Sequence, residues 1–159
     1  MPQTFTRQRL NFEEFEIGQV CMSAGRTVTE ADIVNFAGFT GDYTQLHTNA
    51  QHAELGPFGQ SIAHGVLGMA IASGLLVQLG IMENTIRAFG ELTWKFSRPV
   101  FVGDTTRAEG TVTGLKPMPR AGGGLFTLAV KVINQDGQVV QRGRWVALVA
   151  GTPAEPPLA

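Results

Sequence analysis

Asp42 and His47 are the residues best suited to chemistry in this 159-residue chain. They stand five positions apart in a short polar segment. A carboxylate is ionised at neutral pH, whereas an imidazole changes its charge near that pH, so the two can form an acid/base pair. The spacing alone is weak evidence, because an aspartate after a glycine often serves a turn, and a lone histidine is often a satisfied surface or core group.

A glycine near the start of an apolar segment supplies a second chemical feature. Gly65 follows His64 at the beginning of the run 62–81. If this run is a helix, the N–H groups of its first turn have no partner within the helix and lie at the positive end of its dipole. Such a site would hold a carbonyl oxygen that becomes negative while Asp42 and His47 move a proton beside it.

The run 62–81 is also the element that must position these groups. It contains no charge and no proline, and a helix that is apolar all round must be buried on every side. About 20 apolar residues can also cross a bilayer, but His64, Ser73 and Gln78 interrupt this run and no Lys or Arg flanks it closely. We therefore expect a central helix of a soluble protein with no membrane partner.

Two short helices are predicted on either side of Asp42 and His47. Thr29 and Asp32 resemble a capping box, which starts an amphipathic helix that stops near 38–41. Asn49 is a suitable cap for another short helix. The loop 55–60 between that helix and the central helix either lines the mouth of a site or only connects the two.

The remaining chain shows the period-two pattern of β-strands. Predicted strands cover 20–28, 105–115, 125–133 and a last strand that ends near Val149. In the strand from Thr85 onward, Leu92, Trp94 and Phe96 share the face that we expect to be buried. The pattern predicts an α+β fold in which an antiparallel sheet curls around one helix.

Composition and charge fit one soluble domain, which we place at 1–150, followed by a Pro-rich, disordered tail at 151–159. A net charge of −1 gives no electrostatic reason to expect nucleic acid or an anionic membrane as partner. The single Cys21 cannot form an internal disulfide, which suits a reducing compartment. Because the segment 5–16 is also unlike a secretory signal, we expect a cytoplasmic protein.

The motif residues as a group resemble a known family. The run 36–42 (FAGFTGD), its spacing to His47 and the triplet 63–65 (AHG) before the apolar helix look like the MaoC-like dehydratases, or (R)-specific enoyl-CoA hydratases, of the hot-dog fold. The resemblance covers about 18–149. It implies that Asp42 and His47 are the catalytic pair, that the Gly65 N–H is the oxyanion donor, and that the Ser73 hydroxyl supports Asp42.

The same resemblance implies an activity and an assembly. The expected reaction is the reversible hydration of a trans-2-enoyl thioester to a (R)-3-hydroxyacyl thioester, with coenzyme A as part of the substrate and with no metal or redox cofactor. The family pairs two hot-dog units, so we expect a homodimer or a multiple of one. Two alternatives remain open here: a thioesterase of the same fold, and a non-catalytic acyl-thioester-binding protein.

The chain departs from the family pattern at one point. Many members carry Asn-Pro between the acid and the histidine, where this chain has Thr44-Gln45. Proline would stiffen the turn, and asparagine could hydrogen-bond across it. The substitution leaves the rigidity of the turn and the substrate preference open, but it retains both Asp42 and His47.

Overall fold

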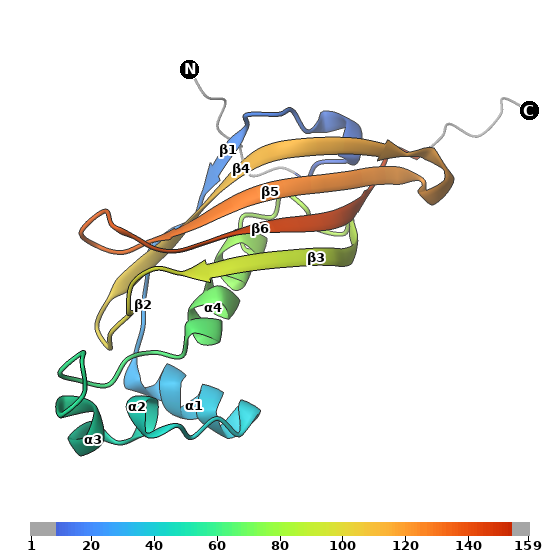
Figure 1. The fold of residues 1–159 in the computed structure, drawn as a ribbon. Helices are drawn as coiled ribbons and strands as arrows, with labels where there is room; N and C mark the ends of the chain where they lie inside the picture. The colour runs from blue at the N-terminus through green and yellow to red at the C-terminus, as the bar shows by residue number, and fades with distance from the viewer. Residues whose placement is uncertain (1–8, 154–159) are drawn as a thin grey trace, which may run out of the picture.

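The computed structural model describes residues 9–153 (Figure 1). The helices are α1 (Glu30–Thr40), α2 (Gln45–Thr48), α3 (Ala50–Glu54) and α4 (Gly65–Val77), with 3₁₀ turns at Phe12–Glu14 and Pro119–Ala121. The strands are β1 (Val20–Met22), β2 (Arg26–Thr27), β3 (Ile86–Phe96), β4 (Thr105–Met118), β5 (Gly123–Ile133) and β6 (Val139–Ala150).

One antiparallel sheet runs in the order β1-β4-β5-β6-β3, and β2 pairs with β4 beside β1. Helix α4 lies against one face of this sheet, and α1, α2 and α3 gather at one end of the molecule, away from the sheet (Figure 1). The predicted arrangement of an antiparallel sheet around one helix is confirmed.

The core lies between α4 and the central strands. Strand β5 turns four alternate side chains inward, each about 1% exposed, which confirms the predicted period-two pattern: Phe126, Leu128, Val130 and Val132. Leu67, Leu75 and Leu76 of α4 are also buried in this core. Complete burial of such a side chain contributes about 1.5–3 kcal/mol, so this contact holds α4 against the sheet.

Helix α4 is shorter than the predicted helix at 62–81. Before it, the Ala63 N–H donates a hydrogen bond to the Val100 carbonyl (2.7 Å), so this part of the run is extended. Behind it, Gly80 adopts a positive φ of 74°, which turns the chain toward β3. Tertiary hydrogen bonds therefore override the helical pattern at one end, and a turn glycine ends it at the other.

The expectation that this helix is buried on every side is wrong. Val66 is 50% exposed and Val77 63% exposed, so one face of α4 is left uncovered. The helix packs chiefly against β4 and β5, and the edge strand β3 lies beyond this contact. Of the three β3 side chains predicted to be buried, Trp94 packs partly buried against the core, whereas Leu92 is 40% and Phe96 55% exposed.

The predicted strand at 20–28 is two strands rather than one. The Ser23 hydroxyl accepts a hydrogen bond from the Ala108 N–H (2.9 Å) in the gap between β1 and β2. The Ser23 N–H still donates to the Ala108 carbonyl (2.9 Å), but a side-chain oxygen replaces the backbone carbonyl as the acceptor, which interrupts the regular pairing with β4.

The last part of the chain lies beside the N-terminal turn. The Gly151 N–H donates to the Gly122 carbonyl (2.9 Å), and the Thr152 N–H donates to Glu13 Oε2 (2.8 Å). The chain is thus held at 151–152, where the disordered tail was expected to begin. The rest of that prediction falls on 154–159, outside the described residues.

Cys21 is buried, and this burial raises the pKa of its thiol to about 11, so the residue packs as an apolar side chain. Among residues 9–153, no helix has the length and apolar character needed to span a bilayer.

Candidate active site

The end of α1 sets the position of Asp42. The predicted capping box is present: Thr29 Oγ1 accepts from the Asp32 N–H (3.3 Å), and Asp32 Oδ2 accepts from the Thr29 N–H (2.8 Å). The helix ends at Gly41, whose φ of 77° is accessible to glycine at little cost. Asp42 is therefore the first residue of the turn that follows α1.

The Asp42 carboxylate is held in its ionised form by Thr44. Oδ1 accepts the Thr44 hydroxyl (2.6 Å) and the Thr44 N–H (3.2 Å). These two hydrogen bonds, helped by the nearby imidazoles of His64 and His47, lower the pKa of Asp42 below its usual value, although slight burial opposes the shift. Thr44, one of the two residues that depart from the family pattern, thus supports the acid directly.

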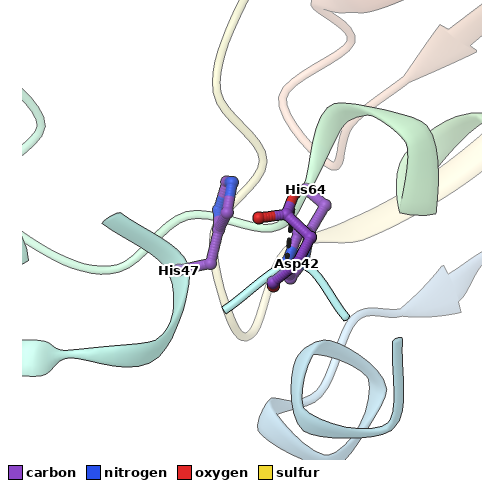
Figure 2. A group of neighbouring side chains, drawn as sticks. All are labelled: Asp42, His47 and His64. Carbon is purple, nitrogen blue, oxygen red and sulfur yellow. Dashed lines mark hydrogen bonds and ion pairs between the residues drawn. The ribbon is translucent and has the colours of Figure 1, made fainter. Parts of the chain in front are cut away.

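His47 lies on the one-turn helix α2, facing the segment before α4 (Figure 2). Its Nδ1 is 2.8 Å from the Ile62 carbonyl oxygen. A carbonyl can only accept a hydrogen bond, so Nδ1 carries the proton and the neutral ring keeps a lone pair on Nε2. This tautomer makes Nε2 of His47 available as a base.

His64 is a third member of the cluster, which sequence reasoning used only as part of a motif. Its side chain is buried, with 2% exposed. Nε2 donates to the backbone carbonyl of Asp42 (3.0 Å) and lies 4.0 Å from Asp42 Oδ2. The ring stacks on His47 with centroids 3.9 Å apart, and Phe36 contacts it at 5.0 Å. The sequence feature that could have identified His64 is its position directly before the apolar helix, where it is the N-cap of α4.

The three side chains converge from three separate segments (Figure 2). One carboxylate oxygen of Asp42 and one ring nitrogen each of His47 and His64 lie within 4.8 Å of one another. These are also ligand types for a divalent metal. However, one nitrogen of each ring already donates to a backbone carbonyl, and a carboxylate beside imidazoles is also the composition of an acid/base site. We therefore interpret the cluster as acid/base machinery.

Gly65 is the first residue of α4, as predicted, and His64 is its N-cap. Among residues 9–153, the Gly65 N–H has no hydrogen-bond acceptor, as is usual in the first turn of a helix. Gly65 and His47 line the same cleft, whose volume is about 410 Å³. Both residues therefore border one surface where a substrate can bind.

The wall of this cleft is largely apolar, with side chains from the loop before α4 and from the end of β3: Phe58, Ile62, Val66, Phe96, Pro99 and Val100. Phe58 belongs to the loop 55–60, so the interpretation of this loop as the mouth of a site is favoured over a mere connector. Arg98 supplies a cation at the same cleft.

Ser73 lies apart from the cluster. It is eight residues beyond Gly65 on α4, which corresponds to about 12 Å along the helix axis. Among the described residues, the hydrogen bonds to the Asp42 carboxylate come from Thr44, and none comes from Ser73. Within the described part of one chain, no hydrogen bond joins Ser73 to Asp42, so the supporting role of the Ser73 hydroxyl stays a prediction.

Comparison with known proteins identifies the domain. The family described as "MaoC like domain" matches residues 13–134. The chain is 36% identical over 106 residues to an (R)-specific enoyl-CoA hydratase of Rhodospirillum rubrum, which covers 67% of this chain and 72% of that protein. It is 38% identical over 97 residues to Protein MaoC of Klebsiella aerogenes, where the match covers 61% of this chain but only 29% of the relative.

Solved structures agree with this match. The MaoC-like dehydratase from Rhodospirillum rubrum superposes with a TM-score of 0.83 at 29% identity, over 91% of this chain and 99% of that one. The sheet wrapped around α4 is the hot-dog fold. The chain belongs to the MaoC-like family.

Proposed function

We propose that the protein catalyses the reversible hydration of a trans-2-enoyl thioester to a (R)-3-hydroxyacyl thioester. The observation that carries this proposal is the close approach, within 4.8 Å, of an ionised carboxylate oxygen of Asp42 and a ring nitrogen of His47. His47 also lines an apolar cleft together with Gly65, the first residue of α4. The names of the relatives, among them a hydratase of Rhodospirillum rubrum, support the same reaction class.

The first step uses one water molecule between Asp42 and His47. Two groups within 4.8 Å can share a water, because each hydrogen bond spans about 2.6–3.2 Å. The lowered pKa of Asp42 makes its carboxylate a good acceptor but a weak base. We therefore assign the proton to His47 Nε2, while Asp42 orients the water. The O–H bond breaks as the oxygen bonds to C3 of the enoyl group.

The second step completes the addition. As the oxygen bonds to C3, the electron pair of the C2–C3 double bond shifts toward the thioester, whose oxygen becomes negative. The Gly65 N–H stabilises this enolate oxygen. The imidazolium of His47 then returns its proton to C2, so that one water is added in total and the enzyme is restored. The reverse sequence dehydrates the hydroxyacyl thioester.

His64 positions the other two groups. Its Nε2–H fixes the backbone of Asp42, and its ring packs against the face of His47. A side chain that is 2% exposed has little freedom to move, so these contacts limit the motion of both reacting groups. Such preorganisation is a recurring contribution to catalysis.

The cleft favours an acyl chain attached to an anionic carrier. Its apolar wall suits the acyl group, and Arg98 suits a phosphate of coenzyme A. Addition of water to a double bond involves no net oxidation, and acid/base chemistry supplies both proton transfers. The proposed reaction therefore requires no metal or redox cofactor.

Spectrophotometry with crotonyl-CoA tests this function. We expect the absorbance of the conjugated enoyl group to fall without release of free thiol, because water adds to the double bond and leaves the thioester intact. Release of thiol would instead identify a thioesterase. Neither change across a panel of short, medium and branched enoyl thioesters would contradict the proposal and favour a binding protein.

We also propose that the active form is a homodimer or a multiple of one. Strand β3 is the edge of the sheet and exposes four large apolar side chains, which are Ile86, Phe89, Leu92 and Phe96. The uncovered face of α4 adds Val66 and Val77. An unpaired apolar edge next to an apolar helix face is typical of an interface.

Light scattering on the purified protein at micromolar concentration checks this prediction. We expect a mass of two chains or a multiple of two, because pairing covers both the β3 edge and the α4 face. As a matched test, Phe89→Glu should weaken the assembly, whereas Ile17→Glu, at an exposed position outside β3 and α4, should leave it unchanged. A wild-type monomer with full activity would rule the dimer out.

A further inference from the structure

Gln141 of β6 is a buried amide that bridges the edge strand and the start of α4. Only 2% of it is exposed. Its Oε1 accepts the Trp94 Nε1–H (3.0 Å), and its Nε2 donates to the Gly65 carbonyl (3.1 Å). From this bridge we infer that Gln141 is a positioning residue that fixes the orientation of the Gly65 N–H, an inference that rests on the proposed function of that N–H.

A β-bulge turns the Gln141 side chain inward. In the pairing of β5 with β6, Val132 lies opposite Gln141 and Ile133 opposite Val139, which leaves Val140 without a partner. Val140 and Gln141 are consecutive and both buried, whereas a regular strand would send one of them outward. Bulges of this kind re-aim a side chain and are frequent beside active sites.

The first turn of α4 leaves room for this amide. A Cβ on Gly68 would overlap Gln141 Nε2, so only a glycine lets the amide reach the helix backbone. Burial of an amide is unfavourable unless its polar atoms are bonded, whereas an apolar side chain of similar size would fill the space without that requirement. The presence of a glutamine rather than an apolar residue at position 141 therefore indicates that its two hydrogen bonds have a role of their own.

The bridge acts where the backbone is least constrained. The Gly65 N–H and the Gly65 carbonyl belong to adjacent peptide units that are joined through the Gly65 Cα. Gly65 is the first helical residue and has no Cβ, so the rotation between these two units is freer than at any other residue type, and a bond to the carbonyl limits it. Gln141 anchors the carbonyl of this residue to Trp94 and thus to β3. A donor held in place before the reaction costs no reorganisation when the enolate forms, which is the basis of an effective oxyanion site.

The test is Gln141→Met, which keeps the approximate volume and removes both hydrogen bonds. Loss of an oxyanion donor lowers kcat by about 10²–10³. Since Gln141→Met leaves the donor present but poorly oriented, we expect a smaller loss, of about tenfold, with KM changed less than about twofold. Val130→Ala is the control, because it opens a cavity in the same sheet without touching the bridge. It should lower the melting temperature and leave kcat unchanged.

Trp94→Phe provides a second variant, which keeps the bond from Gln141 to Gly65 and removes only its anchor. We expect kcat to fall severalfold, and we expect the double variant to be no slower than Gln141→Met, since both changes act through one bridge. If Gln141→Met does not fold, unchanged kcat in Trp94→Phe overturns the inference. In a folded Gln141→Met protein, an unchanged kcat overturns it directly, as does an equal loss of kcat in Val130→Ala.

Amide hydrogen exchange separates this inference from the proposed function. The readout is the Gly68 N–H, which donates to the His64 carbonyl (3.2 Å), because that carbonyl belongs to the same peptide unit as the Gly65 N–H. We expect the Gly68 N–H to exchange faster in Gln141→Met than in the wild type, whichever reaction the protein catalyses. If the wild type hydrates no enoyl thioester but exchange at Gly68 accelerates in the variant, the proposed function fails and the positioning role stands. Unchanged exchange together with unchanged kcat, in a protein that hydrates crotonyl-CoA, rejects the positioning role alone.

Discussion

Asp42→Asn and His47→Gln will each lower the kcat for enoyl-CoA hydration by about 10²–10⁴, the usual contribution of a general acid or base, because His47 takes its proton from a water that Asp42 orients. Both changes are close in shape to the original residues. In the first variant the new amide oxygen can still accept from Thr44, but the side chain no longer carries a charge that orients the water. In the second variant the new amide can still donate to the Ile62 carbonyl, but it cannot take a proton from water. Steady-state kinetics with crotonyl-CoA measures both effects.

His52→Gln is the matched control for this experiment. His52 lies on α3, five residues from His47, and its side chain is exposed. We expect the kcat of His52→Gln to equal that of the wild type. This result would show that a loss of kcat in His47→Gln comes from the position of His47 in the site and not from replacing a histidine by a glutamine. Circular dichroism should report the same fold in all three variants. An effect of less than about tenfold for Asp42 or His47 would remove that residue from the mechanism.

Local signals in the sequence were sufficient to place Asp42. The capping pair Thr29 and Asp32 and the turn glycine Gly41 each act within a few residues, so their pattern predicts where α1 begins and ends. The alternation in β5 is local in the same sense, because one buried face produces it. Elements of this kind are set by backbone geometry and by short-range hydrogen bonds, which a single sequence displays.

The features that were not predicted depend on partners far along the chain. His64 bonds the backbone of Asp42, 22 positions away, and Gln141 bonds Gly65, 76 positions away. Leu92 is half-exposed because β3 occupies the sheet edge, and strand order is a property of the topology rather than of the strand's own pattern. The bulge at Val140 follows from pairing in the same way. Periodicity alone carries no information on these contacts.

Gly65→Pro tests the oxyanion donor while it leaves both acid/base side chains in place. Proline lacks the N–H, and it is tolerated at the first helical position, which Gly65 occupies. Proline also requires an extended residue before it, and His64 already has φ −55° and ψ 134°. The structure therefore predicts that α4 forms in this variant. We expect kcat to be about 10²–10³ below that of Gly65→Ala, the loss expected for one oxyanion donor.

Gly65→Ala is the necessary control because both variants add a Cβ. An ideal Cβ at this position would lie 2.8 Å from Phe96 Cδ1, so some movement of that ring is required. Phe96 is 55% exposed in the single chain, and its ring must make the same movement in both variants. Both variants therefore crowd Phe96 in the same way. Only Gly65→Ala keeps the N–H that can bind the enolate oxygen. If the two folded variants share the same kcat, Gly65 is a close-packing glycine under Phe96 and the enolate oxygen binds elsewhere.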